Sequence, residues 1–216
     1  MRNFLLFILC MMLFSSCGEN HSKVTSKEEK KSVVDVDTTV ADSKPAKPKM
    51  NIDSLMNAKK KDYKFERDEF SSIGSTYVIP KSAPKYRNQN GFYCYFTYEK
   101  NYSPGFFRFV IQYEADNWLF IDNCIFNIDG ENINFTPKEV ERDNSGGRIW
   151  EWVDQAIEQD HVNLIRKIAN AKSVKVKLNG KQYYDTRSLK ENEIKSIKET
   201  LELWENIGGK FYDISY

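Results

Sequence analysis

The chain has 216 residues, with 32 Lys and Arg against 31 Asp and Glu. A charge balance this close to neutral offers no cationic excess for a polyanion, so we expect no nucleic-acid partner. Aromatic residues make up 14% of the chain, and this abundance is typical of a β-rich core rather than of a helical bundle.

The first segment has the pattern of a cleaved export signal. Arg2 precedes an apolar run over residues 4–14, about a dozen residues, which is shorter than the ~20 that a permanent membrane-spanning helix needs. Small side chains then lead to a cysteine. The complete ending, Leu13-Phe14-Ser15-Ser16-Cys17, resembles the lipobox of bacterial lipoproteins.

This resemblance implies that residues 1–16 are a signal peptide and that Cys17 becomes a lipid-modified N-terminus. Two or more acyl chains, such as palmitate, would anchor the protein stably in a membrane. Gly18 replaces the aspartate that retains enteric members of the family at the inner membrane. The resemblance therefore implies a location in the cell envelope, at the outer membrane. The alternative is an ordinary secretory signal followed by an unrelated cysteine.

Residues 17–62 are predicted to form a disordered tether, because they are polar, contain no aromatic residue and show no sustained apolar periodicity. A flexible chain of ~40 residues has an r.m.s. span of roughly 35 Å. Near its end, residues 53–60 match a short helix with Leu55 and Met56 as its apolar contacts.

Residues 63–216 have the size of an ordinary single domain. Alternating apolar and polar residues predict strands in its first half, over residues 92–98, 107–113, 118–128 and 149–153. Asp129 and Gly130 predict a tight hairpin turn into a further strand at residues 133–135.

In the second half of the domain, the spacing of the apolar residues changes first to that of a helix. Apolar residues at helical spacing predict a helix over residues 158–171. A strand over residues 174–178 follows, and Asn179-Gly180 predicts a type I′ turn that sets Val176 opposite Tyr183.

Ser188 and Glu191 then form a capping-box pattern for a final helix, which Gly208-Gly209 ends. The predicted fold class is α+β: an antiparallel sheet or small sandwich, with two C-terminal helices packed on one face.

The residues of common catalytic and metal sites are scarce in this domain. His161 is its one histidine, and its place beside an apolar helix face favours a partly buried structural role over a catalytic base. We therefore assign no catalytic residue, no metal site and no cofactor. Two states are open for Cys94 and Cys124: a disulfide between them in an oxidising compartment, or two buried free thiols.

Two kinds of function remain. The first is a membrane-anchored, non-enzymatic binding or structural module that meets an envelope protein or a glycan. The second is an envelope hydrolase that acts on a glycan or cell-wall substrate through paired carboxylates, such as Glu151 with Asp154 or Asp122 with Asp129. Paired carboxylates arise often by chance in a chain this rich in acids, so the binding module is favoured.

The candidate binding surface consists of aromatic and basic residues from two segments. Alternation must turn outward either Glu151 or the tryptophans beside it, and the arrangement with Glu151 outward is the simpler one, because tryptophan is usually buried. Tryptophans facing outward would instead recognise sugar faces or a protein. The lysines could bind a polyanion or merely protect a sheet edge. The full set is Trp150, Trp152, Tyr184, Lys175 and Lys177.

Overall fold

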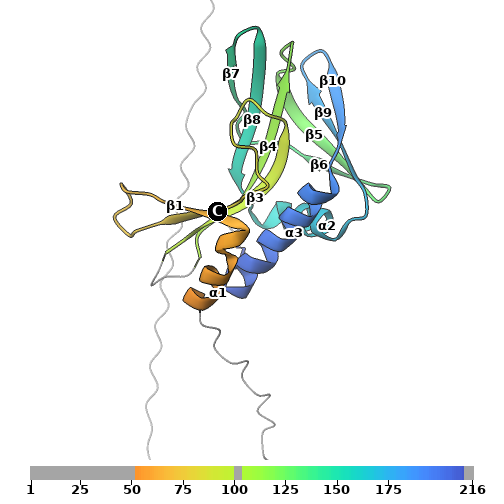
Figure 1. Cartoon of the computed structure of the whole chain (residues 1–216). Coiled ribbons are helices and arrows are strands. Elements are labelled where there is room, and N and C mark those ends of the chain that lie inside the picture. Colours follow the sequence, from red (N-terminus) through yellow and green to blue (C-terminus); the bar gives the residue numbers. More distant parts are fainter. Residues whose placement is uncertain (1–51, 100–103, 212–216) are drawn as a thin grey trace, which may run out of the picture. The chain divides into compact units, whose positions relative to one another are not determined.

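The computed structural model describes residues 52–99 and 104–211. The predicted signal peptide, Cys17 and most of the predicted tether lie outside these residues. The described chain forms two antiparallel sheets, a six-stranded sheet in the order β1-β2-β3-β4-β8-β7 and a four-stranded sheet in the order β10-β9-β5-β6. Figure 1 shows the two sheets with α2 and α3 across one end of them. The predicted α+β class is confirmed.

The helical elements are α1 (Ile52–Ala58), the 3-10 helix η1 (Lys59–Lys61), α2 (Gln159–Asn170) and α3 (Glu191–Asn206). The strands are β1 (Tyr63–Arg67), β2 (Thr76–Pro80), β3 (Gly91–Tyr98), β4 (Phe107–Ala115), β5 (Ile121–Ile128), β6 (Glu131–Phe135), β7 (Glu141–Ser145), β8 (Arg148–Ala156), β9 (Val174–Gly180) and β10 (Tyr184–Ser188).

Aromatic side chains join the facing sides of the two sheets. Phe109 of β4 lies edge-on to Phe135 of β6, with ring centroids 5.9 Å apart, and Phe92 of β3 contacts Phe126 of β5 at 6.3 Å. All four rings are buried. Pairs of this kind stabilise a core by about 0.5–1.5 kcal/mol beyond their buried area. We call the side of the six-stranded sheet that meets this core its inner face, and the opposite side its outer face.

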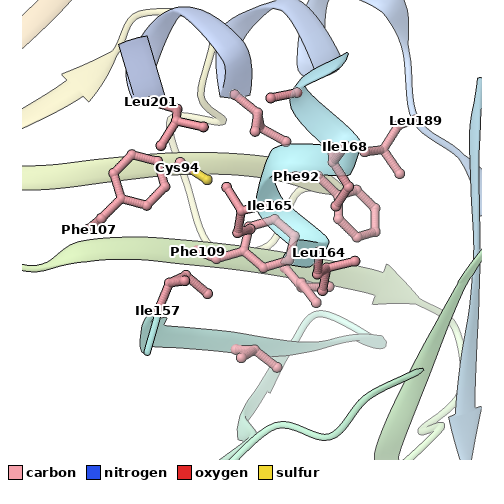
Figure 2. Close-up of a cluster of buried hydrophobic side chains, with 14 of the residues drawn as sticks. Phe92, Cys94, Phe107, Phe109, Ile157, Leu164, Ile165, Ile168, Leu189 and Leu201 are labelled. Carbon is pink, nitrogen blue, oxygen red and sulfur yellow. The ribbon is translucent and has the colours of Figure 1, made fainter. Parts of the chain in front are cut away.

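The two C-terminal helices complete the core. Figure 2 shows Leu164, Ile165 and Ile168 of α2 beside the phenylalanines of β3 and β4, with Leu201 of α3 close by. Ile165 and Ile168 are fully buried, as the helical periodicity predicts. His161, on the same helix, packs edge-on against Phe135 with ring centroids 5.0 Å apart, and its side chain is partly buried, as expected.

The folded unit begins before residue 63. α1 places Met56 in the core, where it is 5% exposed, and Ile52 and Leu55 pack against the same cluster. The helix expected near residues 53–60 is therefore present and belongs to the domain, so the ordered chain extends into the segment assigned to the tether.

The hairpin predicted at Asp129 and Gly130 is confirmed. β5 and β6 pair antiparallel, with Ile128 opposite Glu131. Both turn residues have positive φ, 50° and 97°, as a type I′ turn requires. Asp129 also accepts hydrogen bonds from the backbone of Lys172 and Ser173, at 3.1 and 2.8 Å.

The second predicted hairpin has a different register. Val176 lies opposite Arg187 rather than Tyr183, Tyr184 pairs with Asn179, and the turn falls at residues 181–182. The reason is a close approach, because a Cβ on Gly180 would lie 1.9 Å from the carbonyl oxygen of Leu119. Gly180 is therefore needed inside β9, beside β5, rather than in the turn.

The start of α3 also differs from the expected capping box. Ser188 ends β10 and pairs with Lys175. The N-cap is Lys190, and the Glu193 carboxylate accepts its backbone N–H at 2.8 Å. Glu193 therefore makes the side-chain contact to the N-cap backbone that the sequence pattern assigns to Glu191, two residues earlier.

Candidate binding surface

β8 turns its tryptophans outward, contrary to the simpler expectation. Glu151 is fully buried on the inner face, whereas Trp150 and Trp152 are half-buried on the outer face. The β4 register agrees, since Glu151 lies opposite Tyr113 of the core cluster and Trp152 lies opposite Gln112. The prediction that Glu151 faces outward is therefore wrong.

Hydrogen bonds explain why a carboxylate can occupy the inner face. Glu151 accepts three consecutive backbone N–H groups, from Leu119 at 2.8 Å, Phe120 at 2.7 Å and Ile121 at 2.9 Å. The Nε of Arg142 donates a further bond at 3.0 Å. A buried charge is tolerated when it is paired and fully hydrogen-bonded, and Glu151 meets both conditions.

The same bonds hold an unusual turn before β5. Phe120 has a φ of 56°, which is strained for a bulky side chain. Its ring is 42% exposed and stacks on Trp118, with centroids 5.8 Å apart. Glu151 therefore fixes a turn that presents an aromatic side chain to solvent.

An arginine–aspartate cluster, made of Arg87, Arg108 and Asp154, lies on the outer face. The Asp154 carboxylate accepts bonds from Nη2 of Arg87 at 2.9 Å and from Nε of Arg108 at 2.8 Å. The hydroxyl of Tyr95 donates a further bond to it at 3.0 Å. Asp154 has 10% side-chain exposure, against 40% for Arg87 and 31% for Arg108. Two guanidinium groups thus reach solvent over one nearly buried carboxylate.

Aromatic rings surround this cluster. Arg87 lies over the Trp152 ring at 5.8 Å, and Arg108 lies over the Tyr95 ring at 5.9 Å. Burial raises the pKa of Tyr95, and the neighbouring Asp154 charge raises it further. Tyr95 therefore keeps its proton and acts as a hydrogen-bond donor to Asp154.

A pocket opens beside the cluster on the outer face. Its volume is about 320 Å³, at the lower end of the range for small-ligand sites. We call it the tyrosine pocket, and it is lined by Glu66, Tyr77, Ile79, Arg87, Tyr93 and Tyr95. These residues come from β1, β2, β3 and the loop that joins β2 to β3, so several elements position them.

The predicted basic residues lie on the other sheet. Lys175 and Lys177 project from β9, and Tyr184 from β10, in the four-stranded sheet. The Nζ of Lys177 lies over the ring of Tyr184, 4.0 Å from its centroid, and that tyrosine is 63% exposed. The five residues proposed as one binding surface therefore form two groups on different sheets.

The carboxylates proposed for hydrolysis do not converge. Glu151 and Asp154 point to opposite faces of β8, and each is already bonded to arginine. Asp122 is exposed on β5, while Asp129 caps the backbone at residues 172 and 173. Within residues 52–99 and 104–211, no three His, Cys, Asp or Glu side chains gather as metal ligands.

Cys94 and Cys124 are both buried free thiols, so the structure has the second of the two alternatives left open by the sequence. Burial raises the pKa of Cys94 well above its ordinary value and that of Cys124 to about 12. These are inert packing residues rather than reactive thiols.

Sequence reasoning missed Arg87, Arg108 and the pocket tyrosines. One signal was available, because β3 is aromatic on both of its faces, with Tyr93 and Tyr95 alternating against Phe92. A strand with two aromatic faces has its outer side covered or used for binding. Arg87 lies in a loop, where no periodicity marks it.

Comparison of the chain with protein-family models, with curated proteins and with solved structures gives no match. None of the helices in the described ranges is long and apolar enough to cross a membrane. The class that the fold and surface define is an α+β domain of two antiparallel sheets with an aromatic, arginine-bearing outer face.

Proposed function

We propose that this chain is a lipid-anchored lipoprotein of the bacterial envelope and that its domain is a non-enzymatic binding module. The outer face of the six-stranded sheet is its binding face. Cys17 supplies the anchor, and the polar segment after it gives the domain reach from the membrane.

One observation carries the proposal: the side chains that β8 turns outward. Trp150 and Trp152 lie on the outer face although a buried position is the common one for tryptophan, and a charged residue occupies the inner face in their place. Tryptophan, tyrosine and arginine dominate the energetically important centres of binding interfaces. Here Arg87 lies over the Trp152 ring and also approaches the Tyr93 hydroxyl.

The arrangement of carboxylates also favours binding over hydrolysis. A carboxylate enzyme needs two acids facing one substrate, whereas Glu151 and Asp154 face away from each other. Their oxygens are occupied by arginine, tyrosine and backbone donors. Such carboxylates hold structure rather than transfer protons.

The proposal is tested by affinity capture from the native envelope with the full-length lipidated protein. Trp152→Ala should reduce recovery of the bound partner at least ~10-fold, which is the usual effect of truncating a central interface tryptophan. Tyr184→Ala is the matched control, because it removes an exposed aromatic ring from the other sheet. Equal recovery with both variants would contradict the assignment of the binding face.

A further inference from the structure

The tyrosine pocket has the composition of a site for a sugar ring. Tyr77 and Tyr95 have ring centroids 6.1 Å apart and planes inclined at 52°, and Tyr93 adds a third ring 6.4 Å from Tyr95. Inclined rings offer apolar faces, on which the C–H face of a sugar can stack, with hydroxyl groups at their edges.

Charged donors stand beside these rings. Among the described contacts of Arg87, Nη2 bonds to Asp154 at 2.9 Å and Nη1 approaches the Tyr93 hydroxyl at 3.4 Å. A guanidinium has five N–H donors in a fixed fork, so Arg87 keeps donors for a ligand. The salt bridge to Asp154 fixes the orientation of the Arg87 guanidinium. This side chain therefore loses less conformational entropy when a ligand binds.

The charges closest to the pocket are mostly basic, whereas Glu114, Glu141 and Asp143 lie beside the tryptophans farther along the outer face. Arg87, Arg108 and Lys64 face two carboxylates, Asp154 and Glu66, so three positive groups oppose two negative ones. Lys64 and Glu66 project from the same side of β1, opposite Ile79 and Tyr77. Of these five groups, Arg87 and Glu66 line the pocket itself.

We propose that the tyrosine pocket binds an acidic glycan through a sugar ring that carries a carboxylate. The ring stacks on Tyr77 and Tyr95, and its carboxylate accepts bonds from Arg87. A planar carboxylate matches the guanidinium fork in both charge and shape. This assignment rests on the proposed function, since it names the ligand class of the same outer face.

The test is calorimetric titration of the full-length protein with defined acidic oligosaccharides. The probes are oligogalacturonate, a hyaluronan oligosaccharide and a muramic acid disaccharide, with cellotriose as the neutral control. We expect at least one acidic probe to bind ten or more times as tightly as cellotriose, and to bind more weakly as salt is raised. Equal binding of cellotriose, or no binding of any acidic probe, would overturn the assignment.

Variants locate the site and separate its two parts. Arg87→Gln should weaken acidic-probe binding roughly 10- to 100-fold, as expected for a charged hydrogen bond. Arg87→Lys keeps the positive charge and should reduce the affinity for the acidic probe by a smaller factor. Tyr77→Ala should weaken binding of acidic and neutral sugars alike. Lys177→Gln is the control on the four-stranded sheet and should leave affinity unchanged. An acidic preference that survives Arg87→Gln would contradict the assigned contact.

The two proposals fail in different ways. If Trp152→Ala abolishes capture of a protein partner while no acidic sugar binds, the binding face stands and its glycan ligand is wrong. If acidic sugars bind and Arg87→Gln has no effect while Lys177→Gln abolishes binding, the outer face itself is wrong.

Discussion

Glu151 shows how one side chain determines the orientation of a strand. Its carboxylate satisfies three backbone N–H groups and pairs with Arg142, so the inner position stabilises both the residue and the turn at Phe120. Alternation in the sequence separates Glu151 from its tryptophan neighbours but does not say which group faces inward. That choice depends on a turn thirty residues earlier in the chain.

Glu151→Ala should therefore unfold the domain at much lower urea concentration. The change leaves the Arg142 charge and the buried N–H groups of Leu119 and Ile121 without their partner. We expect a loss on the order of 3–5 kcal/mol in the free energy of unfolding. Glu139→Ala, at an exposed position, is the control and should change it by less than about 0.5 kcal/mol. Comparable losses in the two variants would refute the structural role of Glu151.

The buried thiols give the protein an alkaline sensitivity. The pKa of Cys124 rises from its ordinary 9.0 to about 12 on burial, so the folded state keeps a proton that the unfolded state releases. This contribution to stability is complete below pH 9 and is lost as pH rises from there toward 12.

The expected slope is about 1.4 kcal/mol per pH unit for each such thiol in that range. Urea unfolding at neutral pH and at about pH 10.5 measures it. Cys124→Ala should reduce the decline relative to the parent protein. A decline of the same size in both proteins would mean that this thiol does not contribute.

Successive side chains of β8 alternate between the inner and the outer face of the sheet, and two substitutions test this arrangement. Val153→Ala truncates a core side chain that is 1% exposed and should cost roughly 2–4 kcal/mol in the free energy of unfolding. Trp152→Ala removes a larger side chain from the outer face and should cost less than Val153→Ala. Chemical denaturation of both variants gives the comparison, and the reverse order would place Trp152 in the core.

The pairing register of the β9–β10 hairpin is determined by a contact with Leu119, which lies outside the hairpin. Gly180→Ala should be severely destabilising, by more than about 2 kcal/mol, because the added methyl group meets the backbone at Leu119. Gln182→Ala, in the exposed turn, should be nearly neutral. Equal shifts of thermal unfolding in the two variants would contradict the close approach of Gly180 to the Leu119 backbone.

These hairpins show which parts of the fold the sequence can predict. The turn at Asp129 and Gly130 follows from local backbone preferences, and the structure confirms it. Asn179 and Gly180 carry the same local pattern, yet packing against Leu119 overrides it. The α+β class and the final two helices follow from periodicity, whereas register depends on contacts between distant segments.

The candidate site was less predictable than the fold for the same reason. Trp150 and Trp152 were identified by residue type, but the cluster of Arg87, Arg108 and Asp154 joins a loop to β4 and β8. Residues that are distant in sequence and meet only through sheet pairing leave no motif. Lys175, Lys177 and Tyr184 were grouped with the tryptophans by type and belong to the other sheet.

We propose that the whole chain consists of a lipid anchor at Cys17, a polar tether and a binding domain. Cys17→Ser should move the protein from the membrane fraction to the soluble fraction, because the serine hydroxyl cannot accept the thioether-linked lipid. Fractionation with immunodetection measures this. Cys124→Ser is the control and should stay with the membrane, while a Cys17→Ser protein that also stays there would contradict lipid anchoring.

We propose that the outer face of the six-stranded sheet contacts the partner. Site-specific photocrosslinking in the native envelope tests this contact, with p-benzoylphenylalanine replacing Trp150 on that face or Tyr184 on the other sheet. We expect a discrete crosslinked product from position 150 and none from position 184. Crosslinking from position 184 alone, or equally from both positions, would contradict it.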